Sequence, residues 1–292
     1  MSIKIDFPTI DRLRKGEAEQ RSIRSRDKFR ELSKIYPDRK KVLAEGDSWF
    51  AYFPKFILFG GASNVIDWLK EEYSDKILID DISSSGDEAV AMLSGDAKLE
   101  FLRRLNEEYF DILLFSGGGN DIVGRYDFDY FLLPKTADNT WEDCINKGRF
   151  QRRLEMIECA YADLIELAVQ YSANPNIHIV THTYDIPIPS KEGATFLGGL
   201  LQVDKGRSWM YPYLTDKGIN NNDDQRKIAS YMLTEFKTVL NRVASASNGH
   251  LTVVDTHGTV GNKEWINEIH PNSNGFKKVA KTIFNKGISP LL

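Results

Sequence analysis

Five short apolar runs alternate with helix-like segments along this chain of 292 residues. The runs cover residues 41–45, 77–82, 111–115, 177–181 and 251–255, and apolar residues recur at helical spacing in segments between them. Strands that alternate with helices in this way are typical of a parallel sheet that helices cover on both faces. The alternation therefore predicts an α/β fold, a three-layer α/β/α sandwich around a five-stranded parallel sheet.

The charge and composition divide the chain into a basic arm and one domain. Residues 1–41 contain 13 Lys and Arg against 7 Asp and Glu, whereas the whole chain has a net charge of −4. We expect residues 1–40 to form a helical arm that lies over the domain or joins copies into a homo-oligomer. Residues 41–292 are expected to form the domain. Within it, the Pro-, Gly- and aromatic-rich segment 184–222 is predicted to be an insertion or lid.

The same composition argues against several classes of protein. A small net charge does not favour nucleic-acid binding. Two cysteines, Cys144 and Cys159, provide neither a disulfide framework nor zinc-ligand spacing. The chain shows no apolar signal region and no run near the roughly 20 residues of a membrane span. The expectation is a soluble, cytoplasmic protein with no metal and no cofactor.

Polar glycine turns follow the first three predicted strands. In a parallel sheet these turns lie at one edge, where ligands bind near the switch in strand order. The turns are Gly46-Asp47-Ser48, Ser85-Gly86 and Gly118-Gly119-Asn120. Together they predict a crevice lined by groups from three separate segments.

These turns contain the groups that acyl transfer requires. Ser48 could be a nucleophile if a base removes its proton, and His270 is the candidate base. The developing oxyanion needs donors, which the backbone N–H groups of Ser48 and Gly86 and the side-chain amide of Asn120 could provide. Asp47 is expected to hold its turn through hydrogen bonds to the backbone.

In this order the motifs resemble the four sequence blocks of the GDSL/SGNH hydrolase superfamily. The blocks are Gly46-Asp47-Ser48, Gly86, Gly119-Asn120-Asp121 and His270-Pro271. The resemblance covers roughly residues 42–284. It implies a flavodoxin-like fold and cofactor-independent hydrolysis of esters, often acyl or acetyl groups on lipids or carbohydrates. It also implies that Ser48 is the nucleophile, that His270 is the base, and that Gly86 and Asn120 are oxyanion donors.

One position departs from the pattern of this superfamily. An aspartate is expected three residues before the histidine, and this chain has Asn267 there. An asparagine oxygen could accept the imidazole N–H, but it cannot balance an imidazolium charge. Asp255 or Glu268 could supply the missing carboxylate, or the site could work as a dyad.

The leading hypothesis is a serine esterase that acts on a small ester, a lipid or an acylated carbohydrate. The alternative, favoured by Asn267, is a catalytically weak or inactive module that binds a carbohydrate or a protein partner. A metal-dependent phosphohydrolase is less favoured, because the sequence has no paired-histidine spacing and no Gly-Asn-His-Asp run.

Overall fold

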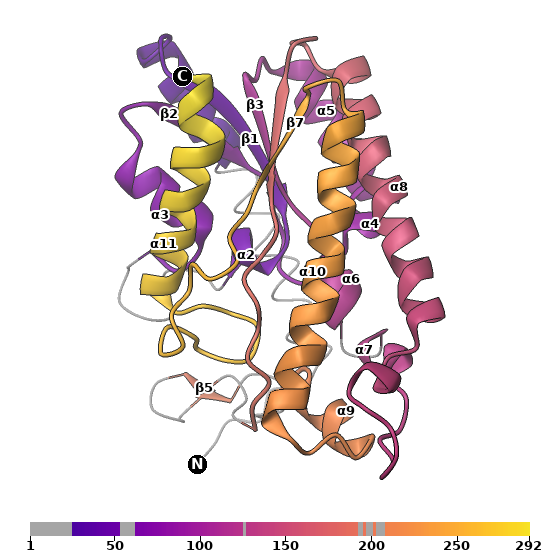
Figure 1. Cartoon of the computed structure of the whole chain (residues 1–292). Helices are drawn as coiled ribbons and strands as arrows, with labels where there is room; N and C mark the ends of the chain where they lie inside the picture. The colour runs from indigo at the N-terminus through magenta and orange to yellow at the C-terminus, as the bar shows by residue number, and fades with distance from the viewer. Residues whose placement is uncertain (1–24, 53–61, 125–126, 192–194, 197–200, 203–207) are drawn as a thin grey trace.

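The protein has a five-stranded parallel sheet between two layers of helices (Figure 1). The computed structural model describes residues 25–52, 62–124, 127–191, 195–196, 201–202 and 208–292. The strands are β1 (Lys40–Gly46), β2 (Ile77–Asp81), β3 (Ile112–Ser116), β4 (His178–His182) and β7 (Leu251–Val254). Each lies within one residue of its predicted limits at either end. The predicted α/β fold is therefore confirmed.

The order of strands in the sheet is β2-β1-β3-β4-β7, and every pairing in it is parallel. This is the flavodoxin-like order, in which the chain moves outward from β1 to one side and then returns to continue on the other. The direction changes between β1 and β3. The crevice at the switch point therefore lies beyond the carboxyl ends of these two strands.

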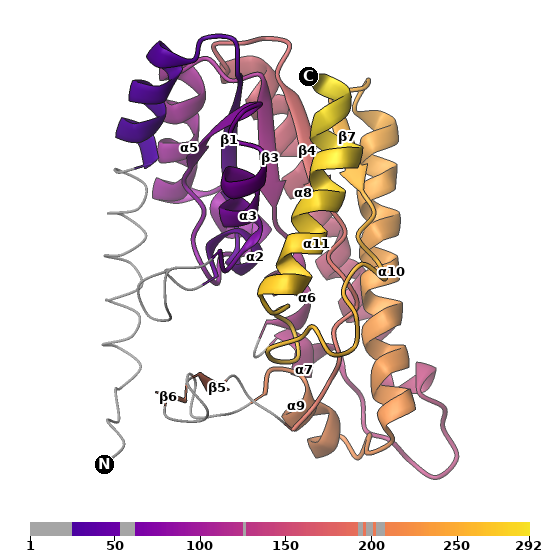
Figure 2. The ribbon, with the colours of Figure 1, turned by 90° about the vertical axis from the view of Figure 1, so that its left-hand side faces the viewer.

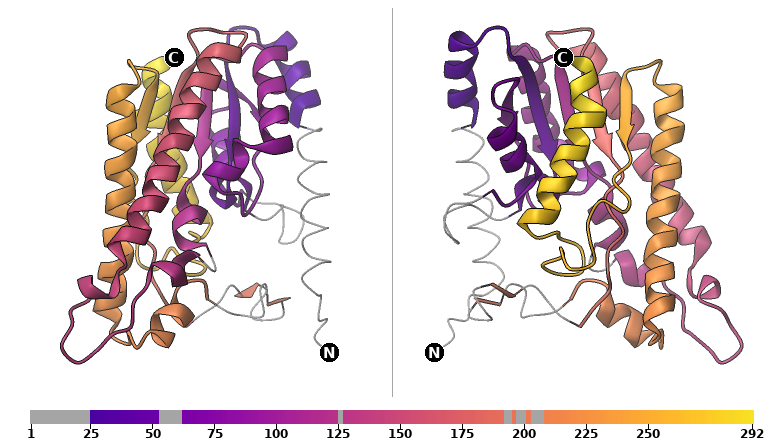
Figure 3. Two further views of the ribbon diagram at one scale, coloured as in Figure 1. Left: turned by 90° about the vertical axis from the view of Figure 1, so that its right-hand side faces the viewer. Right: turned by 60° about the vertical axis from the view of Figure 1, so that its left-hand side comes forward.

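Helices cover both faces of the sheet. One layer contains α3 and α11, which pack against each other, and the other contains α5, α8 and α10 (Figures 1 and 3). Most apolar residues of the five strands are buried, because helices cover both faces of the sheet. The helices are α2 (Ser48–Ala51), α3 (Val65–Glu72), α4 (Ala89–Met92), α5 (Gly95–Glu107), α6 (Gly119–Val123), α7 (Asp127–Phe131), α8 (Lys147–Tyr171), α9 (Tyr211–Asp216), α10 (Asn222–Ala246) and α11 (Ser273–Ile283).

Shorter elements complete the described part of the chain. The 3-10 turn η2 (Glu142–Cys144) precedes α8, and the π-turn η5 (Phe284–Ile288) and the 3-10 turn η6 (Ser289–Leu291) follow α11. The predicted insertion at 184–222 contains α9 and the short antiparallel pair β5 (Thr195–Phe196) and β6 (Leu201–Gln202). The other residues between 192 and 207 lie outside the described residues.

The described part of the basic arm is a helix over residues 25–35 that lies beside α5 (Figure 2). Phe29 is buried, and its ring centroid is 5.2 Å from that of Phe110. Arg26 forms an ion pair with Glu107 of α5. This segment is thus fixed to the domain by an apolar contact and by charge. The first 24 residues of the arm lie outside the described residues.

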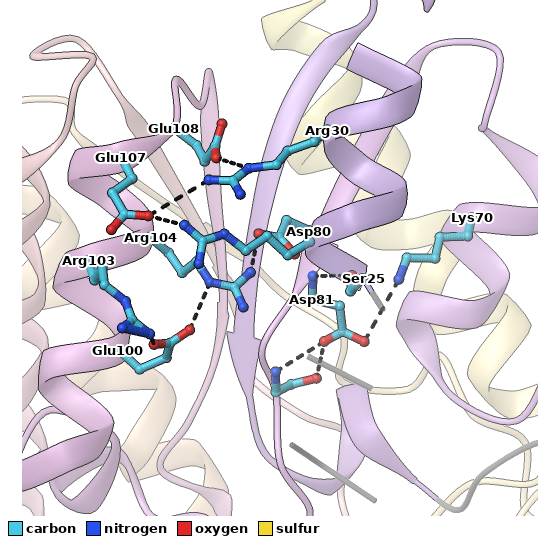
Figure 4. A network of polar contacts seen from close by, with 12 residues as sticks. Ser25, Arg30, Lys70, Asp80, Asp81, Glu100, Arg103, Arg104, Glu107 and Glu108 are labelled. Carbon is cyan, nitrogen blue, oxygen red and sulfur yellow. Dashed lines mark hydrogen bonds and ion pairs between the residues drawn. The ribbon is translucent and has the colours of Figure 1, made fainter. Parts of the chain in front are cut away.

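An ion-pair network joins the edge strand β2 to α5 (Figure 4). Arg104 is buried, and its guanidinium lies 2.5 Å from the buried carboxylate of Asp80. It also lies 2.8 Å from the partly exposed carboxylate of Glu100. At its rim, Arg30 of the arm helix pairs with Glu108. Ion pairs therefore connect the arm helix to the end of α5, and α5 to the edge strand β2.

Candidate active site

Ser48 lies at the point where β1 passes into α2. The close approach of β3 explains the glycine before it, because a Cβ on Gly46 would lie 2.7 Å from the Ser116 Cβ. Asp47 caps α2, accepting a hydrogen bond from the Trp49 N–H at 3.0 Å. Ser48 is the first residue of this helix, so its backbone N–H has no acceptor within the helix. The hydroxyl is thus presented at a helix start beyond the sheet.

The structure brings His270 to Ser48 across 222 positions of sequence. The distance from Nε2 of His270 to Oγ of Ser48 is 2.7 Å, and both residues are buried. The Tyr52 ring lies against the imidazole, with 4.2 Å between ring centroids. Trp49 donates from Nε1 to the carbonyl of Ile269 at 3.2 Å, which fixes the histidine loop to α2.

Asn267 contacts the other ring nitrogen of His270, but through its amide nitrogen. The distance from Nδ2 to Nδ1 is 3.1 Å. Its oxygen accepts the backbone N–H groups of Ile269 at 3.0 Å and of His270 at 2.8 Å. The sequence-based interpretation that this oxygen could accept the imidazole N–H differs from the structure, because two backbone donors of the same loop already occupy the oxygen.

Glu268, one of the two alternative carboxylates, is directed to the insertion. It is buried, and it accepts hydrogen bonds from four backbone N–H groups, those of Ser190, Trp209, Met210 and Tyr211. Burial raises the pKa of Glu268, and these four donors oppose that rise. Glu268 therefore connects two parts of the insertion, Ser190 and residues 209–211, to the loop that contains His270.

Asp255, the other alternative carboxylate, follows β7 and pairs with α10. Its Oδ2 lies 2.5 Å from Nζ of Lys237, and its Oδ1 accepts from Thr183 and from the backbone of His257. Of the three residues considered as partners of the base, Asn267 is the one that the structure places against the imidazole ring.

The two proposed oxyanion donors outside Ser48 differ in position. Asn120 is in the first turn of α6 and lines the pocket beside Ser48. One N–H of its amide is donated to the carbonyl of Asp87 at 2.9 Å, and an amide nitrogen carries two hydrogens. Gly86 lies in an exposed turn with a φ of +94° and is not part of the lining of this pocket. Both remain proposed donors.

An open pocket lies beside Ser48, and its empty space, counted together with the adjoining solvent, is about 370 Å³. Its wall is mainly apolar, and polar groups are concentrated near the serine. The apolar side chains come from Trp49, Val123, Tyr184, Pro187, Leu233 and Ile269, and the polar ones from Asp47, Ser48, Asn120 and Asp185. Such a combination suits a small ligand with an apolar part and one polar centre.

A buried hydrogen-bond network lies behind the serine. The carboxyl of Asp47 accepts hydrogen bonds from Ser116 at 3.0 Å and from the Tyr184 hydroxyl at 2.6 Å. Burial raises the pKa of Asp47 to about 7, against the effect of these donors. Burial also lowers the pKa of His182 to about 3, and its Nε2 lies 2.9 Å from Oγ of Ser116.

The expectation that Asp47 holds its turn agrees with the hydrogen bond from Trp49, but its connection through Ser116 to His182 was not predicted. The structure places His182 behind the pocket, within the sheet. Tyr184 was overlooked because it begins a segment without periodic pattern. Its backbone has a φ of +59°, which turns the chain directly after β4 and brings the ring to the pocket wall. A polar or aromatic residue directly after each strand is the signal that could have indicated this network.

Within the ranges given above, no three or more His, Cys, Asp or Glu side chains are grouped as a metal site. None of the described helices is long and apolar enough to cross a membrane.

No protein-family model matches the chain, and no curated protein matches it. Solved structures do resemble it. A candidate SGNH hydrolase from Slackia heliotrinireducens is 13% identical over 85% of this chain and 98% of that one, with a TM-score of 0.47. A catalytic mutant of an acetylxylan esterase from Geobacillus stearothermophilus is 15% identical over 85% and 93%, with a TM-score of 0.49. A psychrotrophic esterase from Pseudoalteromonas sp. is 13% identical over 86% and 98%, with a TM-score of 0.45.

Proposed function

We propose that this protein is a serine hydrolase that cleaves carboxylic esters through an acyl-enzyme. The observation that carries this proposal is the 2.7 Å contact between Oγ of Ser48 and Nε2 of His270. A hydroxyl and an imidazole within hydrogen-bonding distance are the minimal pair for general-base activation of a nucleophile. The pair is buried beside an open pocket, through which an ester would reach it.

The proposed reaction has two half-reactions. Ser48 Oγ attacks the ester carbonyl carbon while its proton passes to Nε2 of His270. The bond from this carbon to the leaving oxygen then breaks, and Nε2 returns the proton to that oxygen, so that an alcohol leaves and Ser48 is acylated. Water next attacks the acyl carbon and gives a proton to Nε2. The Ser48–carbon bond breaks, and Nε2 returns this proton to Oγ, releasing the carboxylic acid.

The oxyanion of each tetrahedral intermediate requires preorganised donors. The Ser48 N–H at the start of α2 and the second N–H of the Asn120 amide are the proposed donors, because both residues line the pocket. Gly86 would add a third N–H. Its turn is exposed, and its φ is one that glycine adopts without strain.

The pocket supports a short acyl group as the part of the substrate that is bound beside the serine. Val123, Leu233 and Ile269 form an apolar surface there, which favours a hydrocarbon over a charged phosphoryl group. Acetyl and butyryl esters fit this description. The alcohol, whether from a lipid or from a carbohydrate, would extend outward from the open side.

A second candidate function is a catalytically weak or inactive module that binds a carbohydrate or a protein partner. One observation favours it. The reaction above needs Nε2 of His270 to be free of hydrogen when the ester arrives, and Asn267 directs an N–H donor, instead of an acceptor, at Nδ1.

The experiment that tests the proposed function is burst kinetics with p-nitrophenyl acetate and butyrate, with EDTA in a parallel assay. We expect slow turnover that is insensitive to EDTA and disappears in Ser48→Ala. Ser245→Ala is the matched control, because that serine is exposed on α10 and donates only to its own helix at Asn241. Equal rates in the native protein and in Ser48→Ala would reject the serine mechanism and leave the binding module.

A further inference from the structure

The amide of Asn267 has both of its ends occupied by partners that fix which way it points. Its oxygen accepts two backbone N–H groups, those of Ile269 and His270. Its nitrogen faces Nδ1 of His270 at 3.1 Å and the Tyr52 hydroxyl oxygen at 3.5 Å. Reversing the amide would place its NH₂ group against two backbone donors, losing two hydrogen bonds and adding repulsion.

This orientation determines where the imidazole proton resides. An amide N–H can be donated to Nδ1 only if that nitrogen carries a lone pair. A neutral imidazole has a single N–H, which must then be at Nε2. Nε2 is 2.7 Å from Oγ of Ser48, so the ring donates to the serine hydroxyl.

We propose that Asn267 is a positioning residue that holds His270 in the Nε2–H tautomer and thereby restrains acyl transfer by Ser48. The inference rests on the proposed function. In this tautomer the base already holds the proton that it should accept. The imidazolium formed during the reaction would also place an Nδ1–H against the N–H of Asn267, so that the transition state is opposed as well as the resting state.

An aspartate at this position would reverse the preference with little change of shape. One carboxylate oxygen would keep the two backbone N–H groups, and the other would accept Nδ1–H and the hydroxyl of Tyr52. Nε2 would then be free to accept the serine proton. In serine proteases the opposite change, from Asp to Asn, gives the wrong tautomer and lowers turnover by about ten-thousand-fold. Asn267→Asp is therefore expected to raise acylation of Ser48 by up to about that factor.

The tautomer is measured directly by two-bond proton–nitrogen correlation NMR on ¹⁵N-labelled protein, with His270→Gln used to assign the ring. The native protein should show hydrogen on Nε2, and Asn267→Asp should show it on Nδ1. A native ring with hydrogen on Nδ1 overturns the proposal. Because this measurement involves no substrate, it tests the effect of Asn267 on the His270 tautomer independently of any esterase activity.

The restraint is measured by the rate of acylation with p-nitrophenyl acetate in Asn267→Asp. Asn272→Asp is the matched control. It adds the same charge to the same loop, at a helix cap whose side chain accepts from Gly275. We expect a large gain in Asn267→Asp and a change of less than threefold in the control. Equal gains in both variants, or no gain in Asn267→Asp, overturn the restraint. If, in addition, Ser48 is not acylated in any variant, the proposed function falls as well.

Discussion

Two buried aspartates near neighbouring strands differ in their partners, which are charged for one and neutral for the other. Asp80 of β2 faces the buried guanidinium of Arg104 at 2.5 Å. Asp47, directly after β1, accepts from neutral groups, namely a backbone N–H and the hydroxyls of Ser116 and Tyr184. Burial raises the pKa of both carboxyls, and at Asp80 the charge of Arg104 opposes the rise.

The kind of hydrogen-bond partner decides how each carboxyl responds to pH. A charged partner favours the ionised form of a buried carboxylate and makes the pair costly to break. Neutral donors leave the carboxyl of Asp47 with a pKa of about 7, so that it exchanges its proton in the physiological range. The edge strand is thus fixed by charge, whereas the turn that presents the serine contains a group that titrates.

The largest effect is expected from breaking the charged pair. Arg104→Met leaves Asp80 buried without its counter-charge, which should lower the free energy of unfolding by about 3 to 5 kcal/mol. Urea denaturation measures this change. The double variant Arg104→Met with Asp80→Leu should recover most of the loss, because an apolar pair of similar volume replaces the ions. A single variant that loses less than about 1 kcal/mol would show that the pair does not hold the edge strand.

The neutral cluster is tested by the pH dependence of stability in Asp47→Asn. The folded-state pKa of about 7 is above the ordinary value of 3.8, so the folded protein retains a proton that the unfolded chain releases. Its stabilising contribution is complete below the ordinary pKa and is lost as pH rises through 7, by up to about 4 kcal/mol. Asp47→Asn should therefore gain stability relative to the native protein between pH 4 and 8. A constant difference across this range would contradict the raised pKa.

A smaller effect is expected from removing one neutral donor. Tyr184→Phe keeps the aromatic pocket wall and deletes the 2.6 Å hydrogen bond to Asp47. Because a bond to a charged acceptor is stronger than one to a neutral group, the loss should be about 2 kcal/mol at pH 8 and about 1 kcal/mol at pH 5. Chemical denaturation at the two pH values gives both numbers. A larger loss at pH 5 than at pH 8 would mean that the Tyr184 hydroxyl does not stabilise the ionised form of Asp47.

The smallest effect is expected at the rim of the charged network. Arg30 pairs with Glu108, but 45% of its side chain is exposed. Arg30→Ala should change the free energy of unfolding by no more than about 1 kcal/mol, because water screens exposed pairs. A loss as large as that of Arg104→Met would show that the arm helix contributes more than its ion pairs suggest.

The fold could be predicted because its signals are local. In β3, for example, four consecutive apolar residues from Ile112 to Phe115 are buried, since helices cover both faces of the sheet. Polar glycine turns after the first three strands likewise indicated where the crevice would lie. The structure then placed Ser48, Asn267 and His270 together, and their roles in catalysis remain proposals.

What the sequence could not indicate depends on contacts between distant backbone groups. Glu268 was considered a carboxylate for the base, yet it binds four N–H groups of the insertion. The direction of the Asn267 amide is likewise decided by backbone donors of its own loop. Neither a residue type nor a spacing reveals which way a backbone N–H points. Asp47 looked like an ordinary cap for the same reason, since its burial with Tyr184 arises from a segment 137 positions away.

The proposal that Ser48 is a nucleophile can be tested directly with a p-nitrophenyl alkylphosphonate. After long incubation, intact-protein mass spectrometry detects an adduct and peptide mapping locates it. The Ser48–His270 pair predicts one phosphonyl adduct, located on Ser48, in the native protein. It also predicts no adduct in Ser48→Ala and faster labelling in Asn267→Asp. An unlabelled Ser48 in both the native protein and Asn267→Asp, or an adduct that persists in Ser48→Ala, would contradict a serine hydrolase.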